Sequence, residues 1–241
     1  MSVVEPSATR TVLLASLLDS SSTEKAAVAL RSAGEMAVTR PDGGAALRAW
    51  IRDTEPTIIG GRCTVCLAWS EHDRQDLPEV VELGPGGFGS AHHPTTRMLL
   101  EELAERIVGG ERVLDVGCGS GVLAIVGLRL GAEAAIGVDL KKEAVAAARR
   151  NASLNGFADR FEATAEPLTE IHGDFDVVVA NIAREGIVSV AAELVACRRD
   201  GGWVGVSGIT SAQADQVGEF LRPLDEVGSR ADGDWASLVF S

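Results

Sequence analysis

The chain has 241 residues, of which 46% are hydrophobic and 24% are charged, a composition typical of a globular protein with one main domain. It contains no run of about 18 or more apolar residues that could span a bilayer. Its net charge of −13 disfavours binding to long nucleic acids and favours a basic partner. Residues 11–18 are apolar, but they lack the basic leader and cleavage pattern of a signal peptide. We therefore expect a cytoplasmic protein that does not associate with membranes.

The first part of the chain carries the weakest signals. Residues 1–44 are expected to form a small N-terminal segment that ends in a Pro-Asp-Gly-Gly turn, and residues 45–241 are expected to form the main domain. Within the segment, residues 12–18 fit either a strand or a short helix, and residues 22–33 have the alanine and leucine spacing of a helix. A short helix over residues 45–52 would connect the two parts.

Short strands are predicted at the start of the main domain. Residues 57–70 fit two strands around a Gly-Gly pair, and residues 80–83 fit a third. Cys63 and Cys66 form a C-x-x-C sequence, but side chains three residues apart in a strand point to opposite faces, and no second cysteine pair follows at zinc-site spacing. We therefore predict a structural role for both cysteines and no metal site.

A glycine-rich loop at residues 84–93 precedes a helix that is predicted from Pro94 to residue 107. Glycine at this density lets a loop lie close against a ligand, so the loop is predicted to act as a lid. His92 and His93 are adjacent, and adjacent loop residues rarely both bind one metal ion. We expect them to make contacts at the lid and the helix entry instead.

The centre of the sequence is the stretch 113–125, which reads Val-Leu-Asp-Val-Gly-Cys-Gly-Ser-Gly-Val-Leu-Ala-Ile. It predicts a strand, a glycine-rich turn and the start of a helix. Gly117, Gly119 and Gly121 allow the chain to reverse sharply and allow a ligand to approach the backbone. A second apolar strand, at residues 134–138, follows the helix and completes a β-α-β unit that can hold a cofactor.

Neighbouring residues indicate which cofactor this unit holds. A dinucleotide fingerprint G-x-G-x-x-G that begins at Gly117 requires a glycine where this chain has Val122. Asp115 would repel a pyrophosphate beside the turn. The same carboxylate suits S-adenosylmethionine, which has no phosphate and carries a positive sulfonium and a positive amino group. Asp139, at the end of the second strand, would accept hydrogen bonds from the two ribose hydroxyls.

From residue 123 onward, predicted helices and strands alternate regularly. The helices lie at residues 123–130, 141–155, 186–196 and 213–221, and the strands at residues 134–138, 161–165, 175–180, 203–207 and 235–240. Such alternation predicts an α/β fold, a doubly wound, seven-stranded, mostly parallel Rossmann-like sheet with helices on both faces.

Asn181 is a candidate site residue at the edge of this sheet. It follows the apolar residues 177–180 as a lone polar residue, and ligands of such sheets bind at the carboxyl ends of the strands. Its side chain offers a carbonyl acceptor and an amide donor without charge. A helix N-cap is the alternative role, and one asparagine can serve both.

These motifs together resemble the PrmA family, class I S-adenosylmethionine-dependent methyltransferases that modify a protein of the large ribosomal subunit. The family carries F-G-T-G-T-H-P-T-T, D-x-G-C-G-S-G-x-L-A-I, G-x-D and V-V-V-A-N-I; the matching stretches here are residues 88–96, 115–125, 137–139 and 177–182. The resemblance covers about residues 46–241. Residues 90–92 are Ser-Ala-His where the family has Thr-Gly-Thr, and residues 1–44 would be a reduced form of the family's recognition domain.

The resemblance implies roles for individual positions. Thr96, Gly117, Asp139 and Asn181 would contact S-adenosylmethionine. Asn181 would also face the amine that is methylated and act as the catalytic residue, and Phe88 and His92 would line the substrate entry. Asp115, Gly119 and Gly121 complete the predicted cofactor-binding set.

The sequence thus predicts an S-adenosylmethionine-dependent N-methyltransferase that acts on amine groups of a protein, a ribosomal protein in the first place. Four alternatives stay open at this point. Two of them keep the methyltransferase activity but change the acceptor, to another protein or to a small-molecule amine. The other two are a non-catalytic binding module and a nicotinamide-dependent oxidoreductase.

Overall fold

The computed structural model describes residues 2–3, 13–14, 55–68, 70, 73–84 and 91–241. The chain divides into two compact units, one of Met1–Glu55 with Trp69–Glu71 and one of Pro56–Ala68 with His72–Ser241. In the first unit, β1 (Ser2–Val3) and β2 (Leu13–Leu14) pair antiparallel. Residues 13–14 are thus in a strand, one of the two alternatives predicted for residues 12–18. The helices predicted at residues 22–33 and 45–52, and the domain boundary between residues 44 and 45, lie outside the described residues.

The second unit is built on a seven-stranded sheet with the strand order β11-β12-β10-β9-β6-β7-β8. The strands are β6 (Arg112–Val116), β7 (Ala134–Val138), β8 (Phe161–Thr164), β9 (Phe175–Asn181), β10 (Arg198–Thr210), β11 (Glu226–Asp232) and β12 (Trp235–Phe240). The strands β10, β9, β6, β7 and β8 pair parallel, and β12 joins β10 and β11 antiparallel. This topology confirms the predicted doubly wound, mostly parallel sheet.

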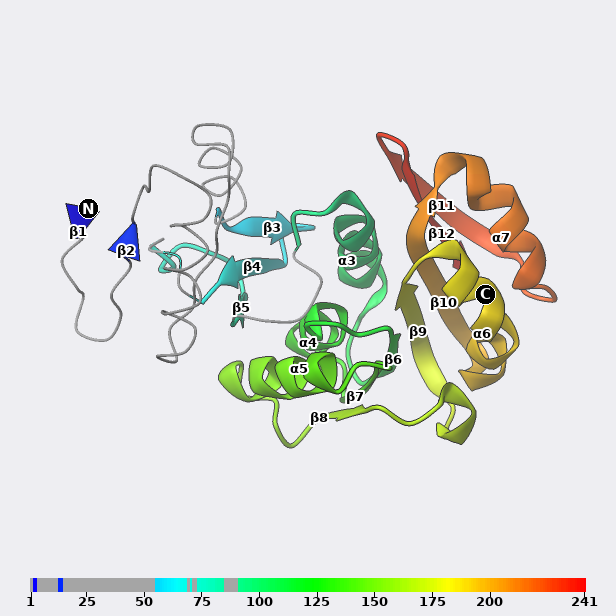
Figure 1. Cartoon of the computed structure of the whole chain (residues 1–241), viewed down its shortest axis with the longest axis horizontal. Helices are drawn as coiled ribbons and strands as arrows, with labels where there is room; N and C mark the ends of the chain where they lie inside the picture. The colour runs from blue at the N-terminus through cyan, green and yellow to red at the C-terminus, as the bar shows by residue number, and fades with distance from the viewer. Residues whose placement is uncertain (1, 4–12, 15–54, 69, 71–72, 85–90) are drawn as a thin grey trace, which may run out of the picture. The chain divides into compact units, whose positions relative to one another are not determined.

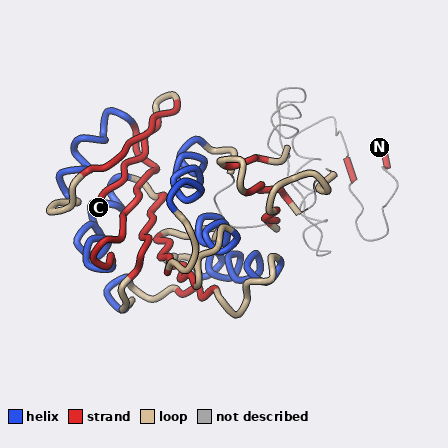
Figure 2. The backbone as a smooth tube through the Cα atoms, turned by 180° about the vertical axis from the view of Figure 1, so that it is seen from behind, coloured by secondary structure: helices blue, strands red, loops and turns tan. Residues whose placement is uncertain are grey.

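Helices cover both faces of the sheet (Figures 1 and 2). They are α3 (Pro94–Arg106), α4 (Val122–Arg129), α5 (Lys142–Leu154), α6 (Arg184–Cys197) and α7 (Ala214–Phe220). All five helices were predicted, and each observed end lies within two residues of the prediction. Figure 1 shows α3, α4 and α5 on one side of the sheet and α6 and α7 on the other, so that two separate hydrophobic clusters form.

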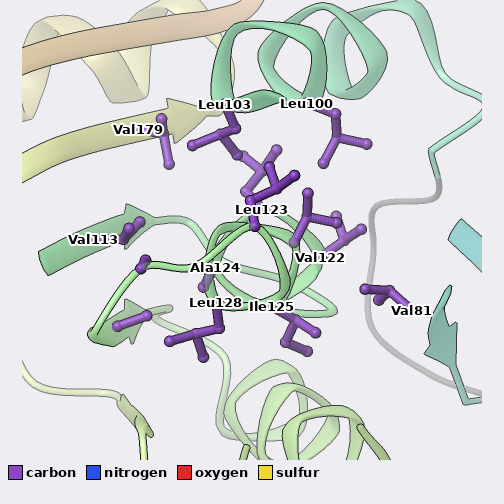
Figure 3. Packing of buried hydrophobic residues seen from close by; sticks show 14 of the residues in the cluster. Val81, Leu100, Leu103, Val113, Val122, Leu123, Ala124, Ile125, Leu128 and Val179 are labelled. Carbon is purple, nitrogen blue, oxygen red and sulfur yellow. The ribbon is translucent and has the colours of Figure 1, made fainter. Parts of the chain in front are cut away.

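The helix α4 lies at the centre of the larger cluster. Its residues from Val122 to Leu128 are all buried, which explains why the sequence there is apolar all round rather than amphipathic. Figure 3 shows this helix among Val113 and Val179 of the sheet, Leu100 and Leu103 of α3, and Val81 of β5. The glycine-rich turn that precedes α4 is therefore held by a helix that is fixed on every side.

A three-stranded sheet packs beside α3, α4 and α5. It contains β3 (Thr57–Ile59), β4 (Cys63–Leu67) and β5 (Val80–Leu83), with β3 antiparallel and β5 parallel to β4, and it confirms the three strands predicted here. Cys63 and Cys66 are buried free thiols, and burial raises the pKa of Cys63 to about 12. A thiol with so high a pKa stays protonated and packs as a small apolar group.

One strand of the large sheet was not predicted. The strand β11 has mostly exposed side chains and only two apolar residues besides a glycine, so it lacks the alternation that identifies a strand in a sequence. Backbone pairing with β12 creates it, and ion pairs join its Arg230 to Glu102 (2.5 Å) and Glu105 (2.6 Å) of α3. None of the helices in the described part of the chain has the length and apolar character needed to cross a bilayer.

Candidate functional site

A pocket of about 400 Å³ opens at the carboxyl ends of β6, β7 and β9. Six of the predicted site residues line it, namely Thr96, Asp115, Gly117, Gly119, Asp139 and Asn181. They come from four separate stretches of the chain, which the parallel sheet brings to one edge. A pocket of this volume is in the range that encloses a small molecule or cofactor.

The glycine turn forms the wall of the pocket next to β6. Gly117, Gly119 and Gly121 all adopt positive φ, at 74°, 54° and 79°, a region that other residues rarely enter. A Cβ atom at Gly117 would lie 2.2 Å from Cγ2 of Ile182, which also lines the pocket. Gly121 is the N-cap of α4 and lies against Ala148 of α5, outside the pocket lining.

Asp115 is the most unusual group in the pocket. It is 1% exposed, and its Oδ2 accepts a hydrogen bond from the Ala124 backbone N–H (3.3 Å), while its Oδ1 has no partner within the described residues. Burial, reinforced by the charge of Asp139, raises the pKa of the Asp115 carboxyl to about 7. A buried carboxylate oxygen without a donor is costly, and a cationic ligand in this pocket would compensate it.

Asp139 links the glycine turn to the start of α5 at the edge of the pocket. Its Oδ2 accepts from the Gly119 N–H (3.0 Å) and its Oδ1 from the Lys141 N–H (2.9 Å). These two bonds fix the plane of the carboxylate. Because each carboxylate oxygen can accept two hydrogen bonds, the fixed group can still accept from a pair of hydroxyls.

Asn181 ends β9 and is held by Thr96 in the first turn of α3. Its Nδ2 donates to Thr96 Oγ1 at 2.9 Å. This bond orients the side-chain amide, whose carbonyl oxygen is the atom that can accept a hydrogen bond from a ligand. His93 is the N-cap of α3, and its ring accepts a hydrogen bond from the Thr95 N–H (3.4 Å). The same ring contacts the Trp235 ring edge-on, with 5.3 Å between the ring centroids.

Of the two residues predicted at the substrate entry, the structure describes only His92, and this residue does not line the pocket. His92 Nε2 lies 3.2 Å from Thr57 Oγ1 of β3, which links the helix entry to the small sheet, and it is outside the pocket lining. Phe88 lies outside the described residues. No group of three or more His, Cys, Asp or Glu side chains that could hold a metal ion occurs among the residues described.

Several lining residues escaped the sequence analysis. Glu166 follows β8, Lys141 is the N-cap of α5, and Ser189 lies in α6. For Glu166 a signal existed, because it stands just after a predicted strand whose carboxyl end had to meet this edge. Ser189, in the second turn of α6, carries no comparable signal.

Asn151 was also not predicted as a site residue, although it connects the glycine-rich turn to the loop predicted as a lid. This buried residue of α5 donates from Nδ2 to the Ser120 carbonyl (2.8 Å), and its Oδ1 accepts from the Gly84 N–H (2.8 Å). The asparagine thus ties the first residue of the glycine-rich loop to the glycine turn. Its partners are 31 and 67 residues away in the chain, so no local pattern marks it.

Asn151→Ala is expected to lower the free energy of unfolding by about 1 to 3 kcal/mol, because it leaves a buried carbonyl and a backbone N–H without partners. Chemical denaturation with and without a bound cofactor product measures this effect. Ser153→Ala, an exposed change on the same helix, is the matched control and should stay within about 0.5 kcal/mol of the parent. Equal stabilities for the two variants would contradict the bridging role.

Comparison with known proteins identifies the family. The sequence model of the family described as ribosomal protein L11 methyltransferase (PrmA) matches residues 17–241. The chain belongs to the PrmA family. This confirms the resemblance inferred from the four motifs.

Individual PrmA relatives agree with this assignment. The ribosomal protein L11 methyltransferase of Geobacter sulfurreducens is 42% identical over 194 residues, covering 79% of this chain and 64% of that protein. That of Geobacter sp. strain M21 is 40% identical over 199 residues, covering 79% and 65%. The chain therefore spans about two thirds of the length of the curated relatives it matches.

A solved PrmA structure agrees with the fold. The crystal structure of ribosomal protein L11 methylase from Lactobacillus delbrueckii subsp. bulgaricus superposes with a TM-score of 0.72 at 28% identity. The match covers 78% of this chain and 98% of that one. The architecture described above is thus the PrmA arrangement of a Rossmann-like sheet.

Proposed function

We propose that this chain is an S-adenosylmethionine-dependent N-methyltransferase that methylates amine groups of a ribosomal protein related to L11. Its PrmA membership supports this function, since the relatives are named for that reaction. The observation that carries the proposal is the buried, half-partnered carboxylate of Asp115 in a pocket that Asp139 also lines. We further propose that the reaction takes place in the cytoplasm, where a ribosomal protein would be met.

The pocket residues fit this cofactor. Asp115 offers an unpaired buried oxygen to a cation, and Asp139 offers fixed acceptors to a ribose diol. Gly117 adopts a positive φ that favours glycine, and because glycine has no side chain a ligand can approach the backbone there. The three acidic residues that line this pocket, Asp115, Asp139 and Glu166, also disfavour the pyrophosphate of a nicotinamide dinucleotide, which argues against the oxidoreductase alternative.

The chemistry needs little from the protein beyond position and charge. Bound S-adenosylmethionine supplies a methyl group on a positively charged sulfur, so transfer to an amine lone pair releases a neutral thioether. In our proposal the Asn181 carbonyl accepts a hydrogen bond from the acceptor amine and aims its lone pair, while Thr96 holds the amide in that orientation. Alignment of this kind lowers the barrier by roughly 7 to 11 kcal/mol.

The amine must be neutral when it reacts. A lysine amine has an ordinary pKa of about 10.4, and a nearby positive charge lowers it. The chain has no tyrosine, and the described lining of the pocket contains no histidine. We therefore propose that the proton leaves to water before transfer and that turnover rises with pH.

Intact-mass spectrometry tests the function. The purified chain is incubated with S-adenosylmethionine and a bacterial ribosomal protein L11, with a basic protein unrelated to ribosomes as the control acceptor. We expect successive methyl additions on L11 alone. Methylation of the control to the same extent would favour another protein acceptor, and methylation of neither by a chain that binds the cofactor would contradict the proposed substrate.

A further inference from the structure

A second pocket, of about 610 Å³, lies at the opposite edge of the large sheet. Its lining includes the first residues of four parallel strands, which are Arg112 of β6, Ala134 of β7, Phe161 of β8 and Phe175 of β9. The methyl-transfer pocket proposed above lies at the other ends of these strands. The two pockets share no lining residue.

The opening exists because the connection from β8 to β9 contains no α-helix. The chain there forms only a single 3-10 turn, Leu168–Glu170, before it enters β9. On the face of the sheet that is opposite α3, α4 and α5, the helices α6 and α7 cover β9, β10 and β12. The part of that face formed by β7 and β8 stays partly open. Ala134 and Ile136 of β7 are accordingly only half-buried.

Three arginines gather at this pocket, in a protein whose net charge is −13. Arg149 of α5 donates from Nε to the Ala163 carbonyl (3.0 Å), and Arg160 donates from Nε to the Glu133 carbonyl (2.9 Å). A second nitrogen of each also donates to a backbone carbonyl, of Ala163 and Ala132 respectively. The guanidinium groups are thus held in place by the backbone.

The salt bridges of the described residues do not include these arginines. In the part of the chain that the structure describes, Arg112, Arg149 and Arg160 take part in no ion pair, whereas most surface arginines such as Arg97 and Arg222 do. A guanidinium has five N–H donors, and each of the three keeps at least three of them. Anchored guanidiniums with spare donors are suited to phosphate groups, which they bind in bidentate fashion.

We propose that this arginine pocket binds a nucleoside di- or triphosphate, with the phosphates on the three guanidinium groups. The volume suits a small molecule of this size. Asp159 and Glu162, which also line the pocket, offer acceptors for sugar hydroxyls. The chain's overall negative charge disfavours the long backbone of an RNA, so the phosphate groups are assigned to a free nucleotide.

Calorimetric titration of the full chain tests the proposal, with pyrophosphate, ADP and ATP as probes and a ten-nucleotide oligouridylate as the RNA arm. We expect ADP and ATP to bind with dissociation constants on the order of 0.1 mM at low salt, and pyrophosphate more weakly. The double variant Arg149→Gln/Arg160→Gln should weaken ATP binding about tenfold or more, since each charged hydrogen bond contributes strongly. Arg222→Gln, which removes one exposed positive charge elsewhere, should leave binding unchanged.

The outcomes separate this site from the methyl-transfer pocket. Titration with S-adenosylhomocysteine reports the latter, and equal affinity in parent and double variant shows that the variant is folded. If the double variant does not fold, Arg112→Gln replaces it, because within the described residues that side chain makes one long hydrogen bond, to the Asp174 carbonyl (3.4 Å), and a cation–π contact with Phe175. Nucleotide binding that is absent, unaffected by the arginine changes, or weaker than that of the oligouridylate would overturn the proposal.

Discussion

Asn181→Ala is expected to lower kcat for methyl transfer by about 10²-fold, while affinity for S-adenosylhomocysteine changes only a few-fold. The physical reason is that alanine removes the acceptor that would orient the amine but leaves the glycine turn and both carboxylates intact. Asn181 is half-exposed and makes one side-chain hydrogen bond, to Thr96, so the fold should survive the change. Single-turnover kinetics with L11 as acceptor measure the effect.

Thr96 supplies the matched control. Thr96→Val removes the hydroxyl that accepts from the Asn181 amide but keeps the shape of the side chain, and it should reduce kcat less than the loss of Asn181 itself. Thr96→Ser restores the hydroxyl and should restore kcat. In the double variant with Asn181→Ala, the change at Thr96 should have no additional effect, because the amide that it positions is gone. Turnover unchanged by Asn181→Ala would remove this residue from the mechanism.

The second large effect is expected at Asp115. Burial raises the pKa of this carboxyl from 3.8 to about 7, so the folded chain holds a proton that the unfolded chain has released. The free energy of unfolding therefore falls as the pH rises from about 3.8 to about 7, and above about pH 7 the cost from this group stays constant. Between pH 5 and pH 8.5 the cost from this one group is about 2 to 3 kcal/mol.

Asp115→Asn removes that dependence, because the amide does not ionise and its carbonyl can still accept from the Ala124 N–H. The variant should gain stability relative to the parent as the pH rises, and denaturant unfolding at several pH values measures the difference. Other titrating groups are common to both proteins and cancel. A stability difference that is independent of pH would contradict the raised pKa.

The same carboxyl links cofactor binding to pH. A sulfonium or ammonium group beside Asp115 favours the ionised form, so binding of S-adenosylmethionine should release a proton near neutral pH. We expect affinity to increase from pH 6 to pH 8 in the parent chain and to be low and nearly constant in Asp115→Asn. Calorimetry in two buffers of different ionisation enthalpy gives the number of protons released.

The fold was predictable where local sequence decides it. Strands β6, β7 and β9 are apolar because both faces of a parallel sheet are buried, and the five helices begin at recognisable turns. The strand β11 was not predictable, because its residues 226–232 are mostly polar and only the pairing with β12 and the ion pairs of Arg230 to α3 define it. The ion pairs with α3 join residues more than a hundred positions apart.

In the candidate site too, some residues were predictable from local sequence and others depend on long-range packing. Asp115, Gly117 and Asp139 belong to one β-α-β unit, so their spacing alone predicted a shared pocket. Asn151 and Ser189 depend on how helices pack against the turn, which no local pattern encodes. His92 was predicted at the substrate entry, and the structure gives it a contact with Thr57 of β3, a strand that begins 35 residues earlier; its role toward a substrate remains a prediction.

Calorimetric titration with S-adenosylmethionine and S-adenosylhomocysteine, of the parent chain and of Asp139→Ala, tests the central claim most directly. Asp139 is fixed by the Gly119 and Lys141 backbone N–H groups, and its removal should weaken binding about tenfold or more, since it would take away two charge-assisted hydrogen bonds to the ribose. We predict micromolar binding of both ligands to the parent and binding at least about tenfold weaker in the variant. Binding to neither protein, or equal binding to both, would contradict the assignment of this pocket to the cofactor.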